Sequence, residues 1–554
     1  MEKIVIYQVL PRLYGNRNTT RKPNGTISEN GCGKLNDFSA KELKEIKNKG
    51  ITHIWFTGVL RHATKTDYSA AGIPRQHPAV VKGCAGSPYA IADYYDIDPD
   101  LAVDVKWRMA EFESLVERTH KAGMKVIIDF VPNHVARQYK SLFQPKGVKG
   151  LGDDDDTTQG FSPQNNFYYC PGEQFSPYFD IYSGQAEPYV ELPAKATGND
   201  HFDSRPGRND WYETVKLNYG VDYYAGGIGL FHPTPDTWHK MLEILKFWAS
   251  KGVDAFRCDM AEMVPAAFWS WALDKLKQAY PEVKIIGEVY NPSLYRTYIA
   301  SGFDYLYDKV GMYDTLRAIT CGHCPASAIT GAWQATDDIA GHMLYFLENH
   351  DEQRIASDFF AGCAFKAVPA LAVSLLLRQN PFMLFEGEEY GEKGMDAEGF
   401  SGRDGRTTIF DYWSIDTLCR AASNQLTADE QRLADIHTKL IGIARSEKAV
   451  SQGQFFDLMY VNPASSSFNP FRHYAFLRKA GNEMLLVVAN FGDMDEEVKV
   501  NIPAHAFDYL NMTEGTHKAH ELLTGITTPL TLAKDSSVSA TVAAHGVAVY
   551  KITF

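Results

Sequence analysis

Cysteine is scarce in this sequence, with eight residues in a chain of 554. Small disulfide-stabilised scaffolds use more than ~8–10% cysteine, so that class is excluded and most thiols are expected to be free. Long apolar runs are also missing, because no stretch approaches the ~18 residues that a membrane-spanning helix needs. The opening MEKIVIYQVL has neither a basic start nor a small-residue cleavage site. We therefore expect a cytoplasmic protein without a membrane partner.

Basic residues are fewer than acidic residues. The chain has 55 basic and 68 acidic residues, which leaves a formal net charge of −13. A field of this sign repels phosphate backbones, so we expect no nucleic-acid partner. Hydrophobic residues make up 45% of the chain and charged residues 22%, as is typical of a folded globular protein. None of these features encodes the oligomeric state.

Three segments repeat one pattern: an amphipathic helical stretch, a lysine close to a glycine, and then a short apolar run. They are residues 40–57, 109–131 and 237–258. Glycine suits the left-handed turn that ends a helix, and a short apolar run is typical of a buried strand. Ser39 and Glu42 predict a capping box at the start of the first helix. The pattern indicates helices that alternate with parallel strands.

Eight strand-like runs continue this alternation, and most of them are separated by room for one helix. They are residues 3–10, 51–57, 124–131, 253–258, 283–288, 303–307, 343–347 and 381–386. Eight such units fit a TIM (β/α)₈ barrel, an α/β fold, better than an open sheet. Active sites of these barrels lie at the C-terminal ends of the strands.

Two parts of the chain interrupt the alternation. About 105 residues separate residue 131 from the helix at residue 237, where a barrel loop normally takes about 2 to 6. We therefore predict an excursion domain at residues 137–232, after the third strand. After a helix opened by a second capping box, Thr427 and Glu430, strand-like runs at residues 473–477, 484–490, 497–502 and 538–552 predict a C-terminal antiparallel β-sandwich at 446–554. Residues 1–136 and 233–445 form the predicted barrel.

Acidic and basic side chains gather at the ends of the predicted strands. They are Asp129 in the third run with Asn133 and His134 just after it, Arg257 in the fourth run with Asp259 just after it, Glu288 at the end of the fifth, and His350 and Asp351 after the seventh. Because parallel barrel strands end at one rim, we predict that these side chains form one reaction centre.

Alternation along the fourth run places Arg257 and Asp259 on one face and Cys258 on the other. An arginine beside a carboxylate favours its ionised, oriented form, as a nucleophile requires. Cys258 is then expected to pack in the core.

The four rim segments, at residues 129–134, 256–259, 287–288 and 349–351, resemble the four signature regions of the α-amylase family of glycoside hydrolases. Residues 87–95, with SPY and DYY, resemble the family's segment after the second strand, and residues 380–388, NPFMLFEGE, resemble its eighth strand. The resemblance covers residues 1–445 and implies the family's barrel, its excursion domain and its C-terminal β domain.

The resemblance also implies a role for each residue. Asp259 would be the nucleophile, Glu288 the general acid/base, and Asp351 the third carboxylate, which holds the hydroxyls of the distorted sugar. The implied substrate-binding residues are Arg257, which would orient Asp259, His134 and His350, which would grip the glucose, and Tyr89, which would stack on it. Asp129 and Asn133 would support the site.

Cleavage of an acetal explains why two carboxyl groups are needed. The transition state resembles an oxocarbenium ion, so one carboxylate attacks the anomeric carbon while a protonated carboxyl group gives its proton to the leaving oxygen. The two groups stand ~5–5.5 Å apart in retaining enzymes and ~6.5–9.5 Å apart in inverting ones. We predict the shorter separation for Asp259 and Glu288.

The expected function is retaining hydrolysis of α-glucosidic bonds in starch-like α-glucans or maltooligosaccharides, through a covalent glycosyl-Asp intermediate. An α-glucanotransferase or an α-glucosidase on the same site is an open alternative. A barrel that has lost catalysis and binds glucan or a partner protein is another, although it would lack part of the carboxylate set.

The sequence departs from the family pattern in two places. Glu262 and Met263 stand where starch-degrading members often have Lys-His, which leaves the choice between hydrolysis and transfer open. Lys216 stands where an Asp commonly binds the structural calcium ion. Because a lysine repels Ca²⁺, we expect no calcium at this site and no other cofactor, even though Asn133 is present.

Two further motifs have alternative interpretations. Cys321 and Cys324 form a C-x-x-C pair, which in principle can bind zinc or do redox chemistry, but they follow a predicted helix, so a plain loop is favoured. Four consecutive acids at residues 153–156 could bind a hard cation, although a solvated loop is the expected structure.

Overall fold

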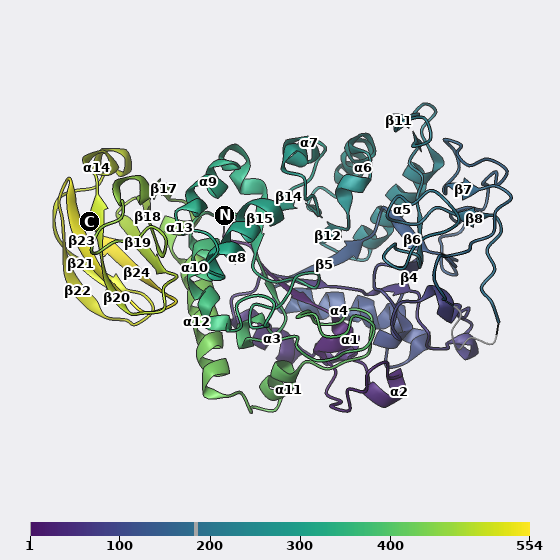
Figure 1. Ribbon diagram of the computed structural model, residues 1–554, viewed down its shortest axis with the longest axis horizontal. Helices are drawn as coiled ribbons and strands as arrows, with labels where there is room; N and C mark the ends of the chain where they lie inside the picture. Colours follow the sequence, from purple (N-terminus) through teal and green to yellow (C-terminus); the bar gives the residue numbers. More distant parts are fainter. Residues whose placement is uncertain (1, 182–186) are drawn as a thin grey trace.

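A closed barrel of eight parallel strands forms the centre of the computed structural model, which describes residues 2–181 and 187–554 (Figure 1). The order around the barrel is β1-β16-β15-β14-β13-β12-β5-β2. The eight runs predicted from the sequence are these eight strands, so the predicted (β/α)₈ fold is confirmed. The strands are β1 (Val5–Val9), β2 (His53–Phe56), β5 (Lys125–Phe130), β12 (Ala255–Cys258), β13 (Lys284–Gly287), β14 (Tyr305–Tyr307), β15 (Met343–Phe346) and β16 (Phe382–Phe385).

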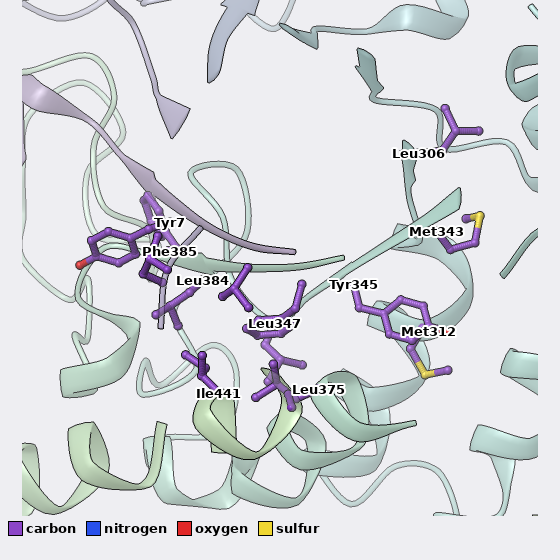
Figure 2. Packing of buried hydrophobic residues seen from close by; sticks show 14 of the residues in the cluster. Tyr7, Leu306, Met312, Met343, Tyr345, Leu347, Leu375, Leu384, Phe385 and Ile441 are labelled. Carbon is purple, nitrogen blue, oxygen red and sulfur yellow. The ribbon is translucent and has the colours of Figure 1, made fainter. Parts of the chain in front are cut away.

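Side chains alternate between the inside and the outside of the barrel. Ile6, Trp55 and Ile127 belong to a buried cluster that fills the interior. Outward-facing side chains pack on the surrounding helices, and Figure 2 shows Leu384 of β16 near Leu375 and Ile441 on two of these helices. Cys258 lies in the outer cluster, as expected.

Helices follow the strands as the sequence pattern predicts. The main ones are α3 (Ala40–Asn48), α4 (Arg108–Lys121), α5 (Asp236–Ser250), α6 (Ala266–Ala279), α7 (Tyr295–Ala300), α8 (Asp314–Thr320), α10 (Val368–Leu376) and α12 (Ala428–Ser446).

The two predicted capping boxes differ in outcome. Thr427 and Glu430 exchange both hydrogen bonds at the start of α12. Ser39 accepts from the Glu42 N–H, but the Glu42 carboxylate accepts from the Tyr14 hydroxyl, and the Ser39 N–H donates to the Asp37 carbonyl. The first box was therefore half wrong, because tertiary contacts supplied other partners.

Three small two-stranded sheets lie in or beside the predicted excursion region, at the end of the molecule opposite the C-terminal sheets (Figure 1). They are β6 (His134–Ala136) with β9 (Thr214–Lys216), β7 (Tyr169–Cys170) with β8 (Ala194–Lys195), and β10 (Val221–Asp222) with β11 (Ile228–Gly229). The pairing of β6 with β9 ties the region to the barrel rim. Residues 182–186 of this predicted domain lie outside the described residues, and its bounds stay a prediction.

The C-terminal region is antiparallel. A six-stranded sheet, β17-β18-β19-β24-β21-β22, lies with a two-stranded sheet, β20-β23, and contacts α10 and α13 (Lys448–Ser451). The run predicted at residues 538–552 was wrong as one strand, because a turn at His545, with a left-handed φ of 47°, divides it. The strands are β17 (Gln454–Asp457), β18 (His473–Ala480), β19 (Glu483–Asn490), β20 (Glu496–Ile502), β21 (Gly515–Glu521), β22 (Thr527–Leu532), β23 (Ser536–Val542) and β24 (Gly546–Thr553).

The cysteine pair and the acidic run lie in loops. Cys321 and Cys324 follow α8, and all eight cysteines of the chain are free thiols. In the acidic run, Asp155 accepts the backbone N–H groups of Asn166 and Phe167, while its neighbour Asp154 pairs with an exposed lysine. Over residues 2–181 and 187–554, no group of three or more His, Cys, Asp or Glu side chains is arranged to hold a metal ion. Within the same ranges, no helix has the length and apolar character to cross a bilayer.

Candidate active site

A cavity of about 330 Å³ opens at the C-terminal rim of the barrel. The three predicted catalytic carboxylates line it together, although they come from strands far apart in the sequence. Loops before β4 (Ile91–Ile97), from the excursion region and after β16 contribute further walls. Among its lining residues are Asp259, Glu288, Asp351, Tyr89, His134, Lys82, Ser87, Trp211, Glu213 and Tyr290.

Arg257 holds two of these carboxylates. Its side chain is 1% exposed, and its guanidinium lies 2.7 Å from Asp259 Oδ1 through Nη1 and 2.8 Å from Glu288 Oε2 through Nη2. The Asp259 and Glu288 N–H groups donate to carbonyls of the neighbouring strands, which extends the barrel ladder by one residue at each strand end. The local fold therefore positions both carboxylates, and one guanidinium joins them.

Asp351 approaches the same cavity from the loop after β15. Its side chain is 44% exposed, so a ligand can reach it, and its Oδ2 lies 3.0 Å from His350 Nε2. Desolvation opposes its negative charge, but His350, by charge and hydrogen bond, and then Arg257 outweigh this effect and lower the pKa of Asp351 to about 2. Asp351 is thus ionised across the physiological range.

Tyr89 and His350 form a stacked pair with ring centroids 5.2 Å apart, and the Tyr89 hydroxyl lies 2.6 Å from His350 Nε2. Asp129 lies beside Tyr89 and binds its hydroxyl. Its Oδ2 accepts from the Trp55 indole N–H at 3.1 Å, and its Oδ1 accepts from Tyr89 at 3.4 Å and lies 3.7 Å from Arg257. The structure brings these predicted residues together, but His350 is buried and is not among the residues that line the cavity, so its contact with sugar stays a prediction.

His134 lies on the excursion side of the cavity, between Asn133 and Trp211. Its Nδ1 is 3.2 Å from the Asn133 amide nitrogen, and its ring centroid is 5.1 Å from that of Trp211. Burial, followed by the charges of Lys216 and Lys82, lowers the pKa of His134 to about 3. A neutral imidazole can both donate to and accept from sugar hydroxyls.

The electrostatics of Asp259 differ from the sequence expectation, in which Arg257 alone favours the ionised form. Burial raises the pKa of Asp259 well above its usual value; Arg257 opposes this, and the charges of Glu288 and Asp351 raise it again. Burial and the two neighbouring carboxylates together outweigh the one guanidinium, so the surroundings favour the protonated form of Asp259 more than the sequence suggests. Positive charge that develops on a bound sugar would shift this balance back toward ionised Asp259.

Sequence reasoning missed several cavity residues. Tyr290, two residues after Glu288, donates a hydrogen bond to Glu288 Oε1 at 2.5 Å. Lys82 and Glu213 form an ion pair of 2.9 Å beside Trp211. Tyr290 could have been suspected from its short spacing to Glu288, whereas the other three lie in loops whose path no sequence pattern reveals.

Glu262 and Met263, which form the first departure from the family pattern, have definite partners. Glu262 Oε2 accepts the backbone N–H groups of Tyr290 and Asn291, and the Met263 carbonyl lies 3.4 Å from Lys216 Nζ. The Glu262 side chain therefore binds a loop of the protein itself, whereas Met263 contacts Lys216 through its main chain.

The surroundings of Lys216 do not fit a calcium ion. Its ammonium is buried, bonds the Asn133 side-chain oxygen and lies 2.7 Å from Asp200 Oδ1. With the Met263 carbonyl, these are the kinds of oxygen that Ca²⁺ binds, but here the lysine ammonium lies among them. A divalent ion at the same place would meet the positive charge at contact distance.

A closed parallel barrel whose C-terminal rim presents three carboxylates to one sugar-sized cavity, two of them held by a buried arginine, defines a class of glycosidase. The family model described as the α-amylase catalytic domain matches residues 8–451. The chain therefore belongs to the α-amylase family of glycoside hydrolases, and the predicted resemblance is confirmed.

Individual relatives are distant. Alpha-amylase 3 of Dictyoglomus thermophilum is 23% identical over 459 residues, which cover 79% of this chain and 81% of the relative. Alpha-amylase MalA of Haloarcula japonica is 26% identical over 365 residues, which cover 65% of this chain but 42% of the relative. The crystal structure of an α-amylase from Geobacillus thermoleovorans complexed with acarbose superimposes with a TM-score of 0.65 at 16% identity, covering 100% of this chain and 98% of that chain. This last likeness supports the fold.

Proposed function

We propose that this protein hydrolyses α-glucosidic bonds of maltooligosaccharides or starch-like α-glucans with retention of anomeric configuration. The observation that carries the proposal is the Arg257 guanidinium, which joins Asp259 and Glu288 in the wall of the cavity that Asp351 also lines. Binding of acarbose by the Geobacillus thermoleovorans relative supports an oligosaccharide as substrate.

In the proposed reaction, ionised Asp259 attacks the anomeric carbon while protonated Glu288 gives its proton to the glycosidic oxygen. The leaving sugar departs with that proton, and a glycosyl ester of Asp259 remains. Water, activated by the Glu288 carboxylate, then hydrolyses the ester. In this proposal Asp351 and the neutral imidazole of His134 hold hydroxyls of the sugar during both steps, and Tyr89 packs on its ring.

The anomer released first tests the proposal. We expect maltoheptaose to yield products whose new reducing ends are initially α, as ¹H NMR of the anomeric protons would record before mutarotation. Initial formation of the β anomer would refute the retaining mechanism, and a purified, folded protein that cleaves no α-glucan would refute the proposed activity.

The second candidate function is transfer of the glycosyl group to another sugar. Glu262 and Met263 favour considering it, since they replace two polar contacts on the leaving-group side. Incubation with maltoheptaose separates the alternatives. A ladder of short maltooligosaccharides indicates endo-hydrolysis, longer oligomers indicate a transferase, and glucose alone indicates an α-glucosidase. The finer assignment rests on this product pattern.

We also propose that the fold needs no structural calcium, because Lys216 already provides a cation between the excursion region and the barrel loops. Excess EDTA is expected to leave the melting temperature and the activity unchanged. Lys216→Met is expected to destabilise the protein by about 1–3 kcal/mol, because Asn133 and the partly exposed Asp200 lose their buried partner.

Calcium titration of the variants supplies the control. Lys216→Asp restores an acidic ligand, so added Ca²⁺ should raise its melting temperature while leaving wild type and Lys216→Met unaffected. Loss of wild-type stability in EDTA, reversed by calcium, would contradict the proposal.

A cytoplasmic location remains part of the proposal. The eight free thiols, including the exposed Cys363, support it, since reducing compartments keep thiols unpaired. Cell fractionation followed by immunoblotting would test it, and recovery of the protein outside the cytoplasm would contradict it.

A further inference from the structure

Tyr290 contacts the carboxyl group to which we assign the acid/base role. Its hydroxyl donates to Glu288 Oε1 at 2.5 Å, and its side chain lines the cavity. Burial, followed by the charges of Glu288 and Asp351, raises the pKa of Tyr290 well above its ordinary value, so the phenol keeps its proton. A donor that stays protonated at this distance makes a strong, charge-assisted hydrogen bond to a carboxylate.

The two oxygens of Glu288 are not equivalent. Oε2 accepts the backbone N–H of Met260 at 2.8 Å and lies 2.8 Å from Nη2 of the buried Arg257. A proton on Oε2 would face a guanidinium and compete with the N–H donor, which costs free energy on both counts. The transferable proton therefore belongs on Oε1, the oxygen that Tyr290 contacts.

Tyr290 is itself held by the loop that follows Asp259. Glu262, in the short 3₁₀ turn Ala261–Met263, accepts the backbone N–H of Tyr290 at 3.2 Å and that of Asn291 at 3.0 Å through one carboxylate oxygen. The loops that carry the nucleophile and the acid/base are thereby fastened to each other.

We propose that Tyr290 is a positioning residue that keeps Glu288 Oε1 directed at the glycosidic oxygen, and that Glu262 fixes Tyr290 for this task. The inference rests on the proposed function. As Glu288 Oε1 gives its proton to the glycosidic oxygen, the C1–O bond breaks with its electron pair on that oxygen, and Asp259 bonds to C1. Tyr290 then donates to the carboxylate that remains. In the second step, water bonds to C1, Asp259 leaves, and the water proton returns to Oε1.

Two substrates with different demands on the acid test this inference. Tyr290→Phe is expected to lower kcat on maltotetraose by about 10- to 100-fold, the loss of one charge-assisted hydrogen bond, with KM little changed. On α-maltotriosyl fluoride, which needs far less proton donation, the same variant should lose less than about threefold. Glu262→Ala should show the same substrate dependence with a smaller loss, and Glu262→Gln, which keeps an accepting oxygen, should stay near wild type.

Tyr509→Phe, an exposed change on α14 (Ala504–Leu510), is the matched control and should leave both rates unchanged. Equal losses on the two substrates would reduce Tyr290 to a structural role and overturn the inference, as would full activity of Tyr290→Phe. If Tyr290→Phe melts below the assay temperature, the ratio of the two rates in Glu262→Ala decides the question. Failure of wild type on both substrates would instead refute the proposed function.

Discussion

Replacing Asp259 with asparagine is expected to lower kcat on maltoheptaose by at least about 10⁴-fold, because a neutral amide cannot form the glycosyl ester. The variant should still fold, since the amide oxygen can accept the hydrogen bond from Arg257 Nη1 that the carboxylate accepts now. Initial rates with coupled detection of reducing ends measure the loss. Mass spectrometry of wild type quenched during turnover of α-maltotriosyl fluoride should show a glycosylated peptide that contains Asp259.

Asp429→Asn is the matched control, because this exposed residue on α12 undergoes the same chemical change away from the cavity. Its activity should equal that of wild type, and the melting temperatures of both variants should be recorded. Substantial turnover by a pure, folded Asp259→Asn protein would remove Asp259 from the role of nucleophile. A sugar covalently bound to another carboxylate would identify that residue as the nucleophile.

Replacing Glu288 with glutamine is expected to lower kcat on maltoheptaose by about 10²–10⁴-fold, the usual contribution of a general acid. The amide has no acidic proton to give to the leaving oxygen. With α-maltotriosyl fluoride the first step should slow by less than about tenfold, because fluoride leaves with little help. The measurement is the ratio of the two rate constants in wild type and variant.

The contact with Arg257 predicts that Glu288→Gln keeps the geometry of the site. Glutamine can keep an oxygen near Arg257 Nη2, so the nucleophile should stay in place and the fluoride rate should survive. Equal losses on both substrates would show that Glu288 acts by holding the site together, and the acid would have to be sought elsewhere on the rim.

The barrel could be predicted because its signals are local. Short apolar runs bounded by helix-ending glycines mark the strands, and parallel closure sends every C-terminal strand end to one rim. The face shared by Arg257 and Asp259 follows from strand alternation alone. By contrast, the pattern did not encode the hydrogen bond from Tyr14 to Glu42, which depends on tertiary packing. Nor did it encode the left-handed turn at His545 that divides the last predicted strand.

Residues on the long excursion could not be predicted in this way. Trp211 and Glu213 reach the cavity wall from a region with little regular structure, so no helical or strand periodicity in the sequence predicts their position. The same holds for the raised pKa of Asp259, because it depends on burial and on two carboxylates carried by other segments of the rim.

The sequence by itself determined the set of barrel strands, the membership of the family and the acidic residues of the rim, because these follow from local pattern and from the topology that it imposes. Only the tertiary structure decided that Lys216 lies among the oxygens of Asn133, Asp200 and Met263, and that Tyr290 bonds Glu288. Such contacts join side chains on separate loops, and their distances are set by how the whole chain packs.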